Sequence, residues 1–440
     1  MTAEALCGLL GISQPTLSRE IAAAGAGILR LGRARATRYA AARSIPAIGG
    51  EFPVYTVDAT GAQRKVATLF ALARGQFWLQ PAEGRGTAFD DLPWFMQDMR
   101  PQGFLGRAFA KTHPALQLPA RLDDWNSDHT LAALVLAGED RIGNVVVGRT
   151  SMDRFLATHE GPVSDDDIVA AYPRLAQQAI DGDPAGSSAG GEQPKFELAR
   201  QGAGGPFHAI VKFSPPTALP EGTRWADLLR AEHHAAATLA RHGTDAARTR
   251  IFAFGDRVFL EVRRFDRVGE RGRRGVVSLG SACDEFAAGR DRYSLAGERL
   301  VHQRLLNPQD AARLAFIEAF GMMIANSDMH FGNVSLACDE PLDPRLEIAP
   351  VYDMLPMRYR PTPEAAQPDP GVANPVPTES LLEAWPAARL AAIEYWGTVA
   401  GDEAISPGFR SIATANGQAL RVGWRGDANR DDRYPPLRTN

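Results

Sequence analysis

Apolar residues recur at helical spacing in the first 24 residues of the chain. Residues 2–10 predict a first helix, whose apolar side chains are Ala5, Leu6, Leu9 and Leu10. Gly11 favours a helix end, and Ser13 is a typical cap for a second helix over residues 14–23. Two short helices joined by a tight turn that contains glycine indicate a helix-turn-helix unit.

The segment that follows has a hairpin pattern and an excess of arginine. Residues 28–32 and 36–39 predict two short strands, like the wing of a winged helix-turn-helix. The first 45 residues contain six arginines and two glutamates, a net charge of +4. This charge suits contacts with DNA phosphates, and the alternative is an ordinary solvated surface. The candidate DNA-binding residues are Arg19, Arg30, Arg33 and Arg35.

Residues 46–182 have a mixed pattern with no cluster of reactive side chains. Residues 53–58, 76–79 and 144–147 predict strands. We interpret this stretch as scaffold, or as a surface for a substrate or partner.

The second half of the chain predicts a sheet followed by helices. Strands are expected at residues 208–213, 251–254 and 258–263, and a long helix at 224–242. From about residue 310 onward the pattern is mostly helical. The fold class expected for the whole chain is α+β.

Composition narrows the functional classes. The 440 residues are 45% hydrophobic and 23% charged, which is typical of a globular protein with about two to four domains. A net charge of −4 excludes a cationic nucleic-acid coat. The three cysteines are far apart and form no CxxC pair, which argues against a disulfide scaffold or a cysteine zinc site. No signal peptide or membrane-spanning run is present in the sequence, so we expect a cytoplasmic protein.

The strongest chemical signal is the string NSDMHFGN, which contains D-x-H-x-x-N. In phosphoryl transfer, an Asp such as Asp328 accepts the proton of the attacking hydroxyl, and an Asn five residues later binds magnesium, here Asn333. Twenty residues further on, an apolar strand ends at Asp353, where a kinase needs a second metal-binding carboxylate. The alternatives are a capped polar loop for the first motif and an ordinary turn residue for Asp353.

A lysine upstream completes the pattern of a nucleotide site. Lys212 lies inside the apolar strand AIVKF, where a buried ammonium group requires an anion. Glu232, on the helix that follows, is the candidate partner, although Glu221 and Asp227 compete for that role. The glycine-rich string SAGGEQPK precedes the strand and predicts a phosphate loop, in which we rank Lys195 behind Lys212 as a phosphate ligand. This order of groups is that of a two-lobed kinase.

The strings SAGGEQPK, AIVKF, VRRFDR, NSDMHFGN and PVYDM together resemble the HipA family of serine/threonine kinase toxins from toxin–antitoxin systems. The similarity is greatest to members with their own N-terminal helix-turn-helix, the YjjJ type. The expected domains are a winged helix-turn-helix at 1–45, a mixed N-terminal kinase lobe at 46–262 and a mainly helical C-terminal lobe at 263–440.

The resemblance implies ATP and Mg²⁺ as cofactors and gives individual residues their roles. Asp328 would be the catalytic base, and Asn333 and Asp353 the metal ligands. Ser188 matches a loop serine whose autophosphorylation silences such kinases, and His330 matches a histidine of the catalytic loop, with a purely structural role as its alternative. The nucleotide-binding residues implied are Ser188, Gly190, Gly191, Gln193 and Lys212. The family usually has an acidic residue where Arg263 stands in the interlobe hinge, which bears on adenine specificity.

The resemblance also implies partners. Family members act on proteins, aminoacyl-tRNA synthetases among them, and bind a separate helix-turn-helix antitoxin. A fused N-terminal unit indicates instead that this chain contacts DNA itself. Two other functions fit the motifs: a small-molecule kinase of the aminoglycoside phosphotransferase kind, and a DNA-binding regulator with an inactive kinase body.

Overall fold

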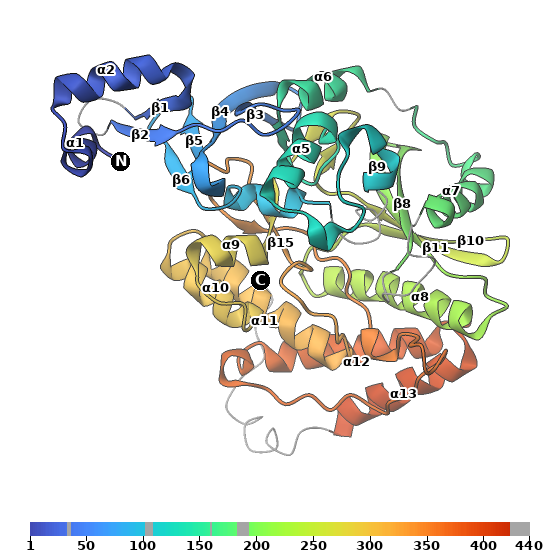
Figure 1. Ribbon diagram of the computed structural model, residues 1–440. Coiled ribbons are helices and arrows are strands. Elements are labelled where there is room, and N and C mark those ends of the chain that lie inside the picture. Colours follow the sequence, from blue (N-terminus) through green and yellow to red (C-terminus); the bar gives the residue numbers. More distant parts are fainter. Residues whose placement is uncertain (33–36, 102–108, 159–160, 183–192, 423–440) are drawn as a thin grey trace.

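The computed structural model describes residues 1–32, 37–101, 109–158, 161–182 and 193–422 (Figure 1). Three parts follow one another along the chain. They are a small N-terminal unit, a middle domain built on a five-stranded sheet, and a larger part with a four-stranded sheet above a helical layer.

The N-terminal unit has two helices and a hairpin. Gly11, with φ of 64°, ends α1, and the Ser13 hydroxyl accepts a hydrogen bond from the Thr16 amide at the start of α2. These elements agree with the helices and hairpin expected from the sequence. Their bounds are α1 (Ala3–Leu10), α2 (Gln14–Ala24), β1 (Ile28–Leu31) and β2 (Arg38–Ala41), with β1 and β2 antiparallel.

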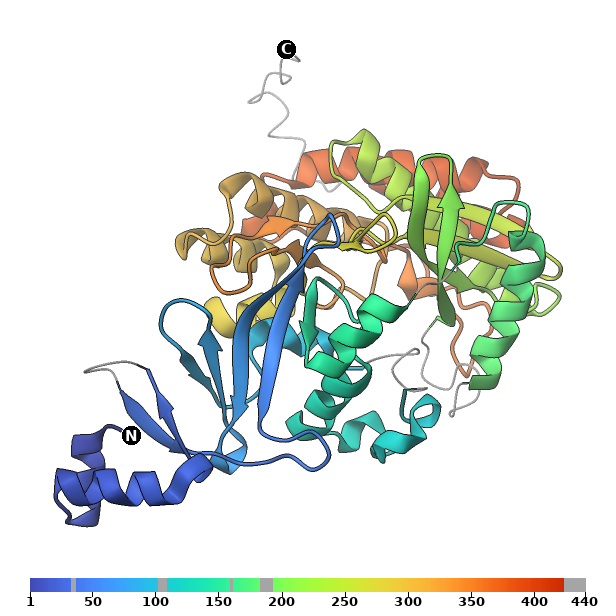
Figure 2. The same cartoon turned by 90° about the horizontal axis from the view of Figure 1, so that it is seen from above.

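The hairpin of this unit is attached to the middle domain. Leu31 packs in one apolar cluster with Leu72 and Trp78 of the middle domain. Just after β2, the Arg43 guanidinium donates to the Leu72 carbonyl at 2.7 Å and binds both carboxylate oxygens of Asp128. Figure 2 shows the unit protruding from one end of the middle-domain sheet.

The middle domain is an antiparallel sheet covered by helices. Its strand order is β6-β5-β4-β3-β7, and the turn at Asp58–Gly61 joins β3 to β4. The strands are β3 (Glu51–Val57), β4 (Gln63–Ala71), β5 (Phe77–Pro81), β6 (Thr87–Phe89) and β7 (Val145–Val147). The helices used below are the 3-10 helix η4 (Trp94–Met99), α5 (Ser127–Ala137) and α6 (Arg149–Ala157).

A second sheet, with strand order β10-β11-β9-β8, lies between two helices. Apolar residues of alternating strand positions, such as Val211 and Phe213, pack against one helix, α7, while Leu260 and Val262 pack against the other, α8. This alternation turns Lys212 toward the α8 face. The elements are α7 (Ile168–Gly182), β8 (Lys195–Gly202), β9 (Gly205–Phe213), α8 (Pro220–Arg241), β10 (Thr249–Phe254) and β11 (Arg257–Arg263).

The C-terminal layer is mainly helical, as the sequence indicated. A hairpin, β12 (Arg267–Val268) and β13 (Gly272–Arg273), leads to a sheet of β14 (Val276–Ser278), β15 (Ser335–Ala337) and β16 (Glu347–Ile348). The helices are α9 (Leu279–Phe286), α10 (Tyr293–His302), α11 (Pro308–Met323), α12 (Trp385–Gly401) and α13 (Pro407–Val422). None of the helices in the described ranges is both long and apolar enough to cross a bilayer.

Helix α12 gives a direct test of this packing. Trp396 is fully buried and its indole N–H donates to the Met323 carbonyl at 3.1 Å, whereas Leu390 on the same helix is 66% exposed. We expect Trp396→Ala to lower the free energy of unfolding by about 3–5 kcal/mol, because it leaves a large cavity. The matched control, Leu390→Ala, should change it by less than about 0.5 kcal/mol. Urea unfolding followed by circular dichroism measures both, and equal effects would contradict this packing.

Candidate active site

A buried lysine joins three separate elements. Lys212 on β9 is 6% exposed, and its ammonium group lies 2.6 Å from the Glu232 carboxylate of α8. The same group forms an ion pair with Asp353, which follows the isolated bridge at Val351. The structure therefore brings together the three residues that the sequence placed 20 and 141 positions apart. The competitor Asp227 instead accepts hydrogen bonds from Ser406.

The pKa values of this triad are set by burial and mutual attraction. Burial alone would lower the pKa of Lys212, but the carboxylates of Asp353 and Glu232 outweigh it and raise that pKa. Burial likewise favours protonation of Asp353, yet Lys212 and then Lys195 hold the pKa of this carboxyl below its ordinary value. For Glu232 burial prevails and raises the pKa. These shifts favour the charged forms of both Lys212 and Asp353.

Asp353 adopts a backbone conformation that few residue types tolerate. Its φ is 53°, in the left-handed region where a short polar side chain costs less than a branched one. The carbonyl of Asp353 is 3.5 Å from the side-chain amide of Asn326. The side-chain oxygen of the same buried residue, Asn326, accepts a hydrogen bond from the Asp328 N–H at 3.0 Å. Asn326, to which the sequence gave no role, therefore links the loop of Asp328 to Asp353.

The loop that follows α11 presents the three polar residues of the D-x-H-x-x-N motif. The Asn333 amide donates to the Asp328 carbonyl at 2.8 Å, which leaves its own oxygen free of that bond. His330 accepts from the Gly332 N–H at 3.1 Å through Nδ1, a contact within the loop. Asp328 and His330 are exposed. The motif is therefore a tightly turned loop whose carboxylate is open to a large partner.

A cleft of about 360 Å³ lies between the middle domain, the four-stranded sheet and the C-terminal layer. Lys195 on β8 pairs in register with Lys212 on β9, so a second lysine lines the cleft. The alternation of polar Lys195 and Glu197 with apolar Phe196 and Leu198 is the sequence signal that indicates a strand with one polar face. The middle domain, which we interpreted as scaffold or as a surface for a substrate or partner, contributes lining residues: Asp98, Met99, Arg100, Pro101, Asp140, Arg141 and Ile142.

Arg263 lies at the end of the cleft that is next to the hinge. Its guanidinium lies 5.0 Å from the centre of the Phe207 ring, and Phe207 belongs to the apolar cluster on the α7 face of the sheet. Arg263 therefore directs its side chain away from the α8 face, on which Lys212 lies. The floor of the cleft beside it is formed by Phe265 and Tyr352, whose ring centres are 5.8 Å apart.

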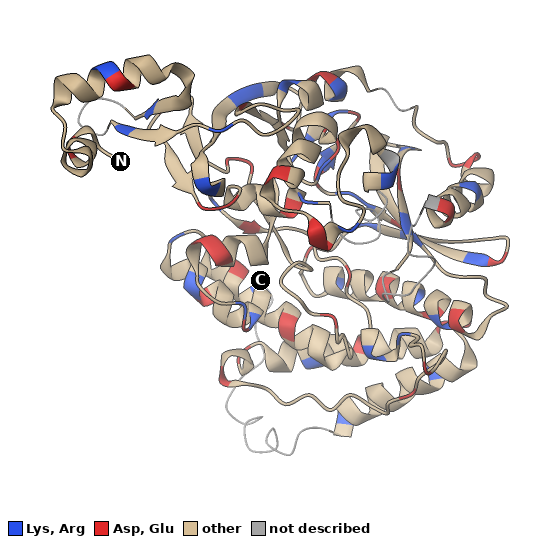
Figure 3. Ribbon diagram, in the orientation of Figure 1, with Lys and Arg blue, Asp and Glu red and all other residues tan. Residues whose placement is uncertain are grey.

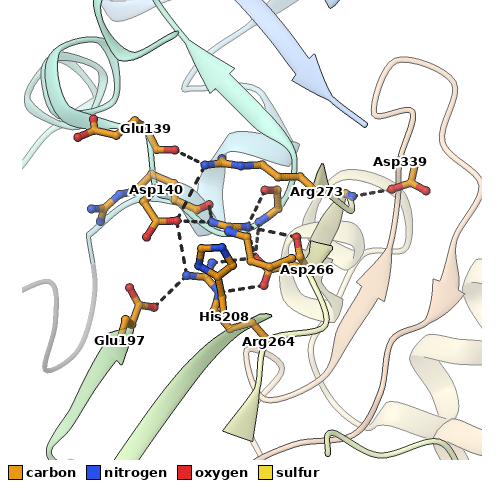
Figure 4. A network of polar contacts seen from close by, with 12 residues as sticks. Glu139, Asp140, Glu197, His208, Arg264, Asp266, Arg273 and Asp339 are labelled. Carbon is orange, nitrogen blue, oxygen red and sulfur yellow. Dashed lines mark hydrogen bonds and ion pairs between the residues drawn. The ribbon is translucent and has the colours of Figure 1, made fainter. Parts of the chain in front are cut away.

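A charge network, buried at Arg264, Asp266 and Arg267, connects the hinge to the middle domain (Figure 4). Asp266 binds the guanidinium groups of Arg264 at 2.9 Å and Arg267 at 2.6 Å. Asp140 of the middle domain lies 2.6 Å from Arg267 and 3.6 Å from Arg264. Burial would raise the pKa of Asp266, but Arg264 and Arg267 outweigh it and hold that pKa far below the ordinary value. The network holds the middle domain against the hinge.

Several predicted residues fall elsewhere or outside the described residues. The Gln193 amide donates to the Phe213 carbonyl at 2.8 Å, beside Lys212. Arg19 and Arg30 are exposed on the N-terminal unit. Figure 3 shows basic positions on α2 and on the hairpin. The predicted residues Arg33, Arg35, Ser188, Gly190 and Gly191 lie outside the described residues.

Comparison with known proteins agrees with this architecture. Residues 48–156 match the family described as the middle domain of YjjJ-like toxins, and residues 187–386 match the HipA-like C-terminal domain. A chain in the complex of HipA, HipB and operator DNA from Shewanella oneidensis MR-1 superposes with a TM-score of 0.53. The two are 15% identical, over 84% of this chain and 96% of that one. The fold is thus that of HipA-like proteins.

A closer relative places the chain within that class. Toxin YjjJ of Escherichia coli K12 is 38% identical over 416 residues, which are 94% of this chain and 93% of that protein. The chain therefore belongs to the YjjJ-like toxins, the branch that its motifs indicated.

The charge network predicts a specific pH dependence. Because the pKa of Asp266 is depressed in the folded state, its stabilising contribution is present above the ordinary aspartate pKa of about 4 and is lost as the pH falls below it. We expect Asp266→Asn to lower the free energy of unfolding by about 3 kcal/mol at pH 7, since it removes the carboxylate that two buried guanidinium groups share. The difference in the free energy of unfolding between wild type and Asp266→Asn should become smaller below a pH of about 4.

Urea unfolding at several pH values measures this effect. The control is Asp123→Asn, which alters an exposed pair with Arg121. A gap between wild type and Asp266→Asn that stays constant from pH 7 to the acid range would contradict the assigned charge state.

Proposed function

We propose that this protein is an ATP- and Mg²⁺-dependent serine/threonine protein kinase of the HipA type. The observation that carries the proposal is the convergence of Lys212, Glu232 and Asp353 at one cleft, tied through Asn326 to the loop of Asp328. Burying an ammonium group between two carboxylates carries a desolvation cost. In kinases a lysine in this position binds the phosphates of the nucleotide.

The residues present fit the metal that this function requires. Asp353 and the free oxygen of Asn333 are hard ligands of the kind that Mg²⁺ prefers. Among the described residues, no group of three His, Cys, Asp or Glu side chains could hold a metal by itself. A magnesium site of two protein ligands that shares phosphate oxygens with the nucleotide agrees with this donor set. When bound, Mg²⁺ would neutralise charge on the phosphates.

The chain's own residues would bind, orient and accept a proton. Lys212, and Lys195 opposite it, would contact the phosphates, with Gln193 and the loop around Ser188, Gly190 and Gly191 beside them. Asp328 would accept the proton of a hydroxyl group. Its exposure supports a serine or threonine on a protein as the acceptor rather than an enclosed small molecule.

Toxin activity and DNA binding complete the proposal. The relative at 38% identity is named a toxin, and the HipA neighbour was solved with HipB and operator DNA. We infer that residues 1–45 act as a winged helix-turn-helix that binds DNA, and that a helix-turn-helix antitoxin is a candidate partner. The protein substrate would be of the class that HipA-type kinases modify, of which aminoacyl-tRNA synthetases are examples, and Ser188 would be the autophosphorylation site.

The role of Asp328 can be tested by a conservative change. Asp328→Asn keeps the shape of the side chain and removes its ability to accept a proton, so we expect phosphoryl transfer to fall by about 10²- to 10⁴-fold. Labelled ATP with Mg²⁺, followed by phosphosite mapping, measures autophosphorylation and transfer to lysate proteins. Asp343→Asn, at an exposed turn, should retain wild-type activity. Retained activity in Asp328→Asn would rule out this residue as the base.

The DNA-binding role is tested separately. Neutralising substitutions at both Arg19 and Arg30 should weaken binding to DNA and reduce the slope of log affinity against log salt concentration by about 1 to 2. The reason is that each phosphate contact releases roughly one counterion. Arg121→Ala, on an exposed side chain of the middle domain, is the control. Fluorescence anisotropy across a salt series gives both slopes, and identical slopes in the double variant and wild type would refute this interface.

A further inference from the structure

The loop of Asp328 is held by the first turn of α9. Helix N-termini leave backbone N–H groups without partners inside the helix. In α9 the N–H of Leu279 donates to the Val334 carbonyl at 2.8 Å, and the N–H of Gly280 donates to the Phe331 carbonyl at 3.1 Å. Both carbonyls belong to the catalytic loop or its exit, so the position of this helix end sets the position of the loop.

The middle domain supplies half of the cap of α9. Ser278 is the N-cap residue, and its hydroxyl accepts from the Ser281 N–H at 3.0 Å. In a capping box, a Glu or Gln at the position of Ser281 would also accept from the N-cap N–H, but a serine is too short. Here the Ser278 N–H donates to the carboxylate of Asp98, in η4 of the middle domain, at 2.6 Å.

A second path from the same place reaches the loop. Ser278 on β14 pairs in register with Ser335 on β15. The Ser335 hydroxyl lies 2.8 Å from the Tyr352 hydroxyl, and Tyr352 donates to the Gly332 carbonyl at 2.9 Å. Both paths therefore end on residues 331–334, between His330 and the strand that follows the motif.

Packing fixes η4 against α9. The rings of Trp94 in η4 and Phe286 in α9 have centres 5.0 Å apart and meet edge to face. Trp94, Phe95 and Met96 are buried in the main core. Asp98 is therefore held in place by an apolar contact between the two domains, and it lines the cleft together with Ser335 and Tyr352.

We infer that Asp98 of the middle domain is a positioning residue for the catalytic loop. It fixes the N-terminus of α9, whose amides hold the carbonyls of Phe331 and Val334, and so it keeps Asp328 at the distance from the cleft that transfer requires. The inference rests on the proposed kinase function for its catalytic consequence, but its structural part is independent of it. The middle domain is thus a component of the active site and not only a scaffold.

The test compares two substitutions in the full chain. Asp98→Ala removes the acceptor, and we expect kcat for autophosphorylation to fall about tenfold with KM for ATP unchanged within about twofold, because the base is displaced while the residues proposed to hold the nucleotide, Lys212 and Asp353, keep their contacts. Asp98→Asn retains an acceptor oxygen and should restore kcat to near the wild-type value. Asp284→Asn is the control and should match wild type; Asp284 lies on α9 and forms an exposed ion pair with Arg290 beyond the end of that helix.

Hydrogen exchange provides a readout that does not need activity. In Asp98→Ala the amides of residues 279–281 and 328–334 should exchange faster than in wild type, while those of the α12 core should not change. If wild type transfers no phosphate, the kinase proposal fails and exchange alone decides the role of Asp98. Unchanged exchange in Asp98→Ala, unchanged kcat despite faster exchange, or an Asn variant as impaired as the Ala variant would each overturn the inference.

Discussion

The ion pair between Lys212 and Asp353 is the constraint around which the rest of the structure is arranged. An ammonium group on an apolar strand loses its hydration, and that loss must be compensated by charges fixed nearby. Glu232 comes from the helix that crosses the sheet, and Asp353 comes from the C-terminal layer. One side chain therefore fixes the relative positions of the sheet, its covering helix and the segment that precedes the helical layer. The cleft lies where these parts meet.

The middle domain completes this arrangement from the opposite side. Asp140 and Asp266 both bind the arginines of the hinge, and Asp98 caps helix α9 of the C-terminal layer. Both contacts are made by carboxylates that accept hydrogen bonds from backbone or guanidinium N–H groups. A domain that carries no reactive motif of its own thus shapes the cleft at its hinge end and near the catalytic loop.

The sequence allowed prediction of those parts of the site that obey a local rule. Lys212 was identifiable because it interrupts an apolar strand, and Asp328, Asn333 and Asp353 because their order and spacing are characteristic. Asp98 was not, since its partner Ser278 lies 180 positions away and a lone aspartate just after an apolar run belongs to no recognisable motif. Lys195 was ranked behind Lys212, although its strand register places it opposite Lys212. Pairing between distant segments is the information that local patterns lack.

The attachment of the N-terminal unit has a mechanical consequence. Its hairpin shares an apolar cluster with Leu72 and Trp78, and Arg43, just after β2, binds the carboxylate of Asp128. These contacts attach the unit directly to the middle domain. If that unit binds DNA as proposed, a bound duplex would therefore fix the direction in which the cleft opens. Neighbouring copies along one duplex would face the same or opposite ways according to the helical repeat between their sites, and the access of a proposed protein substrate to their clefts would differ accordingly.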